Sequence, residues 1–147
     1  MNNSHLAAAA IATNQEGEIL MVQEGKGQAK GTWTFPGGSF EDREQLRETA
    51  EREFLEETGY SIETGPVIGV YLEESVRTGN TVAVFLYEAQ ITERRHSGLN
   101  DGEILDAQFF SPHQIQDLNL GKENRRKMLE DYLEGRGFSQ NRITDTR

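Results

Sequence analysis

The chain contains no cysteine among its 147 residues. This absence excludes a disulfide framework, a cysteine-based zinc site and a cysteine nucleophile. No apolar run approaches the roughly 20 residues that a membrane-spanning helix needs. The apolar stretch at residues 6–12 is short, with no basic segment before it and no cleavage site after it, so it does not resemble a signal peptide. We therefore predict a cytoplasmic protein with no membrane partner.

Basic residues are also scarce, with 15 Lys and Arg against 25 Asp and Glu, for a formal net charge of -10. So acidic a surface repels the phosphate backbone of long nucleic acids, whose binding needs Lys and Arg. The composition therefore argues against a long nucleic acid as a partner. The acid excess serves either solubility or the binding of metal ions.

The length is typical of one domain and allows about two thirds of the unfolded surface to be buried. Neither an internal repeat nor a linker divides the sequence, so we predict a single domain over residues 1–147. The last ten or so residues are polar, and a frayed, disordered end is expected there.

Apolar periodicity and turn residues predict the order of the elements. A helix is expected at residues 44–58, capped by Asp42 with Gln45 as its partner and ended by Gly59. The other predicted elements are strands at 6–13, 19–22, 33–35, 66–77, 81–92 and 106–110, a helix start at 111–114 and a helix at 122–134. Strands on both sides of a central helix, with a closing helix, predict an α/β (α+β) sandwich around a mixed sheet.

Three carboxylates fall within five residues of the central helix. At about 100° per residue, Glu53, Glu56 and Glu57 share an arc of roughly 100°, and Glu57 projects into the apolar sector. That sector is defined by Leu46, Ala50 and Phe54. A carboxylate beside buried surface must be paired or bind a cation. Hard oxygen ligands suit Mg²⁺, with Mn²⁺ as a substitute, and a solvated acidic face is the alternative.

Two further features frame these acids. Glu44 and Arg52 are eight residues apart, so Glu44 must lie in the first turn or the preceding loop to bend towards Arg52 and lock the loop onto the helix. A solvated surface pair is the alternative. Gly37 and Gly38 let the backbone approach an ion closely and offer carbonyls to it. An ordinary turn would also explain them.

Together these residues resemble a complete Nudix box. Its spacing is Gly38, five residues, Glu44, seven residues, Arg52-Glu53, Phe54, one residue, Glu56-Glu57, one residue, Gly59 and Tyr60. The box covers 23 residues, and residues 33–38 resemble the usual lead-in to it. The order of predicted strands extends the resemblance over most of residues 4–135.

The resemblance implies an α/β/α sandwich and a hydrolase acting on phosphorus-containing anhydrides. It also implies that Glu53, Glu56 and Glu57 bind divalent metal ions, and that the Glu44–Arg52 pair is structural. In such a site the ions neutralise phosphate oxygens and activate the attacking water. Members of the family differ in the general base, which here is either Glu53 or a loop acid.

Glu103 is the candidate for that loop acid and for an extra metal ligand, because the segment at 101–111 resembles the corresponding family loop. A solvent-facing acid is the alternative, and Glu73 and Glu74 rank lower. Lys26, Lys30 and Arg77 are candidates for binding a substrate phosphate, although each is also explained as a surface cation. A base could stack on one of the aromatic residues Phe35, Tyr71, Phe85 and Tyr87, although core packing is the better explanation for Phe85.

The box determines the reaction and leaves the substrate open. The absence of cysteine excludes the isopentenyl-diphosphate isomerase reaction, and the proline typical of many ADP-ribose pyrophosphatases has no counterpart. By elimination we expect a nucleoside tri- or diphosphate, either normal or damaged. The alternatives are ADP-ribose or a dinucleoside polyphosphate, an RNA 5′-end and a non-catalytic nucleotide-binding regulator. The family resemblance also allows a homodimer.

Overall fold

The computed structural model describes residues 5–75, 78–98 and 102–147. The strands are β1 (Leu6–Thr13), β2 (Ile19–Glu24), β3 (Trp33–Thr34), β4 (Gly37–Ser39), β5 (Tyr60–Glu74), β6 (Thr81–Arg94) and β7 (Ile104–Phe110). The helices are α1 (Leu46–Thr58), α2 (Pro112–Ile115) and α3 (Asn124–Leu133), with short 3₁₀ turns at η1 (Gly27–Ala29) and η2 (Gln140–Arg142).

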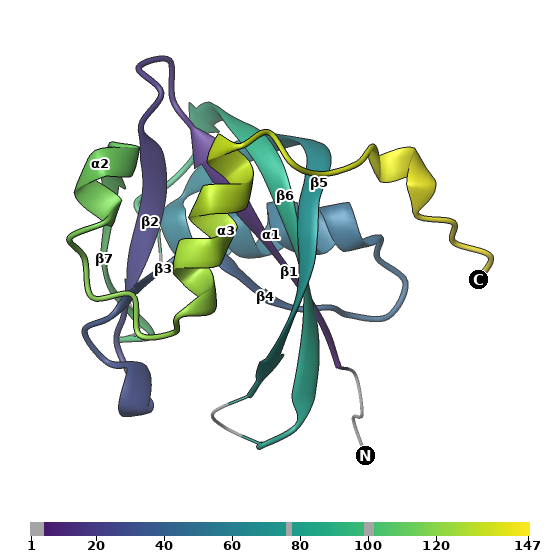
Figure 1. The fold of residues 1–147 in the computed structure, drawn as a ribbon, viewed down its shortest axis with the longest axis horizontal. Coiled ribbons are helices and arrows are strands. Elements are labelled where there is room, and N and C mark those ends of the chain that lie inside the picture. Colours follow the sequence, from purple (N-terminus) through teal and green to yellow (C-terminus); the bar gives the residue numbers. More distant parts are fainter. Residues whose placement is uncertain (1–4, 76–77, 99–101) are drawn as a thin grey trace.

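All seven strands belong to one mixed sheet. Its main path runs β3-β2-β1-β6-β5, with β4 paired to β1 and β7 paired to β2. The β1–β6 pair is parallel and every other pair is antiparallel. Helix α3 covers one face of the sheet and α1 lies behind the opposite face (Figure 1). The predicted α/β/α sandwich with a mixed sheet is therefore confirmed.

Strand β1 is central although five of its residues are alanines, which favour helix. Its alternate side chains enter two different cores. Ala8 and Ala10 face α1 and pack with Phe54, whereas Ala9 and Ile11 face the α3 side. Tertiary packing overrides the helix propensity of alanine here. The backbone N–H and C=O groups of β1 form hydrogen bonds with β6, and the small side chains let α1 approach closely.

Helix α1 begins later than the sequence pattern predicts. Its N-cap is Gln45, whose backbone N–H donates to Glu48 Oε1 at 2.8 Å, so the predicted cap at Asp42 is wrong. The physical reason lies at Arg43, whose φ of 75° breaks the helical path. The predicted C-cap is confirmed, because Gly59 has φ 80° and its N–H donates to the Leu55 carbonyl at 2.8 Å.

Other boundaries also differ from the predicted ones. Strand β5 starts directly after Gly59, since its first residues pair with the end of β6 before a bulge near Pro66. Gly37 and Gly38, for which an ordinary turn was the alternative interpretation, form β4 against β1. Residues 138–147, expected to be frayed, lie against β5 and the start of α1, where Phe138 exchanges two 2.8 Å backbone hydrogen bonds with Val67. No helix in the described part of the chain is long and apolar enough to cross a membrane.

Candidate active site

The site is built where β4 passes beside α1. The Gly37 N–H donates to Glu57 Oε1 at 3.0 Å, which draws that carboxylate in under the strand. Gly38 lies directly on the Glu53 carboxylate, since a Cβ at this position would overlap with Glu53 Cδ. Any other residue at position 38 would push the Glu53 side chain aside.

Glu57 occupies an environment that disfavours its charge. Burial raises its pKa to about 9, and the negative charges of Glu53, Glu24 and Glu56 act in the same direction, against the single Gly37 N–H. Burial also raises the pKa of Glu53, although Arg52 opposes the shift. The fold thus concentrates more carboxylate charge here than its own donors and cations neutralise.

Arg52 lies between two glutamates and binds both Glu44 and Glu53. Its Nε and Nη2 donate to the two Glu44 oxygens at 3.1 and 3.0 Å, and Nη2 also donates to the Ser39 carbonyl at 3.0 Å. Thr49 adds a 2.6 Å hydrogen bond to Glu44. The Arg52 hydrogen bond is the main reason why the pKa of Glu44 falls to about 2. The predicted lock between the loop and the helix is present, and it also fixes Glu53 through Arg52 Nη1 at 2.9 Å.

The donor set fits a hard divalent cation, because several carboxylates share a partly buried position with an excess of negative charge. These carboxylates do not form a ready-made coordination sphere. Within residues 5–75, 78–98 and 102–147, no group of three acidic or histidine side chains is arranged to hold an ion by itself. Arg52 Nη1 instead lies 2.9 Å from Glu53 and 3.5 Å from the half-exposed Glu56. An ion would therefore have to draw Glu53 and Glu56 away from Arg52.

Glu103 is linked to this acidic group through its charge, which acts on Glu24. Its Oε1 accepts from Lys26 Nζ at 2.9 Å, and its backbone carbonyl accepts from the Gly25 N–H at 2.8 Å. Lys26, expected to reach a substrate phosphate, is thus seen in an ion pair with Glu103. Burial raises the pKa of Glu24, and the negative charge of Glu103 acts in the same direction; Glu24 in turn helps to raise the pKa of Glu57.

Sequence reasoning missed Glu24. The available signal was its position at the end of the apolar run of β2, where the acid lies at the end of a strand.

The structure also shows where two of the candidates for stacking on a base lie. Phe35 is 3% exposed in the core, and Tyr87 is 1% exposed, so neither is available to stack on a base.

The remaining candidate residues have different environments. Lys30 is exposed and caps the η1 turn. Arg77 lies outside the described residues. Glu73 is bound by Arg125 Nη1 at 2.7 Å and faces Lys122 at 3.4 Å, so it is a paired structural acid. Glu74 is exposed.

Comparison with known proteins agrees with this geometry. The family model described as NUDIX domain matches residues 3–132. A putative 8-oxo-dGTP diphosphatase of Bacillus subtilis (strain 168) is 41% identical over 129 residues, which are 87% of this chain and 79% of that protein. Putative nudix hydrolase 1 of Caenorhabditis elegans is 31% identical over 85% of this chain, and the match spans only 33% of that longer protein.

A solved NUDIX hydrolase from Nitrosomonas europaea has the same fold. It superimposes with a TM-score of 0.86 at 24% identity, covering 97% of both chains. The match to the family model over most of the chain, together with the box residues gathered beside β4, shows that the chain belongs to the Nudix hydrolase family.

Proposed function

We propose that this protein is a Mg²⁺-dependent hydrolase, with Mn²⁺ as a substitute ion, that cleaves a phosphoanhydride bond in a nucleoside tri- or diphosphate. The observation that carries this proposal is the surplus of carboxylates around Glu57. Burial and three neighbouring acids make its charge costly, and a divalent cation is the natural partner for such a group.

In the proposed mechanism, some residues bind the ion and others position its ligands. Glu53, Glu56 and Glu57 would hold the ion, with Gly37 or Gly38 offering a backbone carbonyl and Glu103 as an extra ligand. A bound Mg²⁺ ion supplies charge neutralisation at phosphate oxygens and lowers the pKa of coordinated water. The Gly37 N–H keeps Glu57 aimed at the site, and Arg52 sets the position of Glu53.

The reaction itself is a displacement by water. The water oxygen forms a bond to one phosphorus, the anhydride P–O bond breaks and the leaving phosphate departs with the bonding electron pair. A carboxylate accepts the proton of the attacking water. Two carboxylates are candidates for this base: Glu53, held by Arg52, and Glu103, held by Lys26. Because both are also proposed ligands, glutamine at the base would lower kcat even at saturating Mg²⁺, where weaker ion binding no longer limits the rate.

The substrate class rests on the Bacillus relative, which is 41% identical over 87% of this chain and carries the name 8-oxo-dGTP diphosphatase. We therefore favour a purine nucleoside triphosphate with an oxidised base, ahead of ADP-ribose or a dinucleoside polyphosphate. The formal net charge of -10 disfavours an RNA 5′-end, because binding a long phosphate backbone requires neutralising cations.

The test is an assay of wild type and Glu57→Gln against oxidised and normal nucleoside tri- and diphosphates, ADP-ribose and dinucleoside polyphosphates. Each reaction is run with Mg²⁺ and with a chelator, and released phosphate and pyrophosphate are measured separately. We expect metal-dependent turnover that falls at least about a hundredfold in the variant. Equal activity of the two proteins would remove the carboxylate site from the mechanism.

A further inference from the structure

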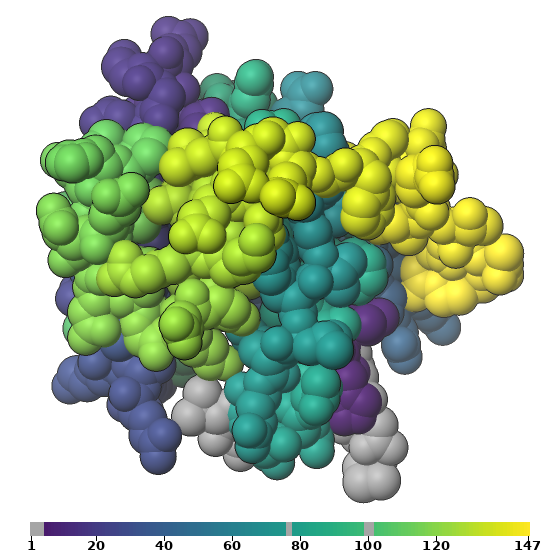
Figure 2. Space-filling model, in the orientation of Figure 1, coloured from purple at the N-terminus to yellow at the C-terminus, as the bar shows by residue number. Residues whose placement is uncertain are grey.

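The residues after α3 run back to the N-terminal end of α1. We call residues 138–147 the tail segment. Phe138 pairs with Val67 through two backbone hydrogen bonds, and Gln140 Nε2 donates to the Gly65 carbonyl at 2.6 Å. Ile143 then packs against the apolar cluster on the α1 side of the sheet. The tail segment stands out at one end of the molecule (Figure 2).

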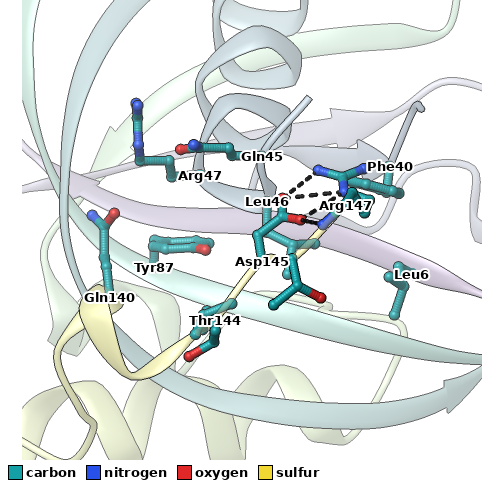
Figure 3. A pocket seen from close by; sticks show the side chains of 12 residues that line it. Leu6, Phe40, Gln45, Leu46, Arg47, Tyr87, Gln140, Thr144, Asp145 and Arg147 are labelled. Carbon is teal, nitrogen blue, oxygen red and sulfur yellow. Dashed lines mark hydrogen bonds and ion pairs between the residues drawn. The ribbon is translucent and has the colours of Figure 1, made fainter. Parts of the chain in front are cut away.

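Beyond Ile143 the tail segment bridges a cavity of about 410 Å³. The walls include Leu46 and Tyr87 on the body of the protein and Thr144 on the tail segment. On the far side of this cavity Arg147 returns to the protein surface (Figure 3). The stretch between Ile143 and Arg147 is therefore anchored by its two ends.

Three groups fix the Arg147 guanidinium. Asp145 pairs with it at 2.6 Å, and the Phe40 ring lies beneath it with its centroid 5.1 Å from Cζ. Its Nη2 donates to the backbone carbonyl of Glu44 at 2.5 Å. Arg147 thus holds one residue of the loop that precedes α1.

That loop is under strain where Arg147 binds it. Arg43, the residue before Glu44, has φ 75°, which is costly for a residue with a Cβ. Such conformations persist when the surrounding structure over-determines them. Here the Glu44 side chain binds the Glu41 N–H at 2.9 Å, and Arg147 holds the Glu44 carbonyl.

From Glu44 the contacts continue to the carboxylate site. Glu44 holds Arg52 through two hydrogen bonds, and Arg52 holds Glu53 at 2.9 Å. We propose that Arg147 is a positioning residue that acts through Glu44 and Arg52 to set the place of Glu53. The proposal rests on the proposed function only in that Glu53 serves as a metal ligand.

The experiment uses the full chain and three variants. Arg147→Ala removes the contact, Arg147→Lys keeps the charge without the planar fork, and Arg142→Ala is the matched control on an exposed arginine of the same segment. Hydrogen exchange of the amides at residues 40–45 is measured by mass spectrometry. Mn²⁺ binding is titrated without substrate, and kcat and KM are measured over a range of Mg²⁺ concentrations.

We expect faster exchange at residues 40–45 in Arg147→Ala, and a metal dissociation constant about three- to tenfold higher, since loss of outer-shell support weakens metal sites. KM at saturating Mg²⁺ and the melting temperature stay near the wild-type values. Arg147→Lys recovers part of the metal affinity, and Arg142→Ala matches wild type.

Two outcomes overturn the proposal. One is unchanged exchange and metal binding in Arg147→Ala, and the other is an equal effect of Arg142→Ala. Weaker metal binding and faster exchange in a protein that hydrolyses none of the nucleotides would support the positioning role. That same result would count against the proposed function, so the two failures are distinguishable.

Discussion

The two faces of the sheet both carry half-buried or buried acids, and the fold treats them in opposite ways. On the α1 face, Glu53 and Glu57 have raised pKa values because burial and mutual repulsion outweigh their donors. On the α3 face, Glu73 and Asp131 are also desolvated, yet their pKa values are lowered.

The difference lies in the partners. Glu73 is bound by Arg125 and Asn124 and faces Lys122, and Asp131 accepts from Tyr71 Oη at 2.7 Å with Lys127 Nζ at 3.0 Å. These acids have donors or cations of the protein beside them, and their contacts hold α3 onto β5. The acids of α1 have fewer partners for their charge, and in the proposed function a metal ion would supply the missing positive charge.

The largest expected difference in stability is between variants in which one acid of each face is replaced by glutamine. In the absence of metal, Glu57→Gln leaves the free energy of unfolding unchanged or higher, because a neutral side chain suits that buried position. Glu73→Gln costs about 3 kcal/mol, because Arg125 is left without its charge partner. Urea unfolding with chelator compares them, and a less stable Glu57→Gln protein would remove the distinction between the two faces.

Arg125 gives the reciprocal test on the α3 face. Arg125→Met keeps the aliphatic part of the side chain and leaves Glu73 buried without its strongest donor, so we expect a loss of roughly 3 kcal/mol. The double variant Arg125→Met with Glu73→Leu should recover much of that loss. Additive losses in the double variant would show that the pair does not act as a unit.

The pH dependence of stability should report on Glu44. Its pKa is about 2 in the folded protein against 4.5 as the ordinary value, so its stabilisation is complete above about pH 4.5. It is lost as the pH falls towards 2, and amounts to roughly 2–3 kcal/mol. Thermal unfolding from pH 6 to pH 2 checks this, with Glu44→Gln expected to flatten the profile. An equally steep profile in that variant would assign the acid sensitivity to other carboxyls.

Tyr71→Phe should have a smaller effect, about 1–2 kcal/mol, because it removes one hydrogen bond to the buried Asp131. Hydrolytic activity should remain near that of wild type, since this contact lies on the α3 side. A cycle with Asp131→Asn, measured by chemical denaturation, isolates the interaction. A large fall in kcat would mean that the α3 face also serves the reaction.

The smallest change in stability is expected for Lys26→Gln. Its ion pair with Glu103 is more than half exposed, so the free energy of unfolding should change by less than about 0.5 kcal/mol. If Lys26 leaves Glu103 for a substrate phosphate, KM rises in Lys26→Gln and stays unchanged in the control Lys30→Gln. Steady-state kinetics on both variants decide between the two lysines.

The sequence predicted the acid face of α1 well because helical geometry alone puts Glu53, Glu56 and Glu57 on one arc. It also predicted the Gly59 cap and the Glu44–Arg52 pair. It failed at the start of α1, where Arg43 adopts a left-handed conformation that no local pattern announces. It also missed Glu24, because a strand-end acid becomes part of a site only through what the sheet places beside it.

The sequence by itself therefore determined the helix that carries the proposed site, since spacing along one helix is a local property. The tertiary structure decided which acids have too few hydrogen-bond donors and cations around them. Gly37 and Gly38 reach Glu57 and Glu53 only because β4 pairs with β1, and Arg147 reaches Glu44 only because the tail segment folds back along β5. Contacts between segments about 20 to 100 residues apart depend on how the sheet is assembled, so local pattern cannot specify them.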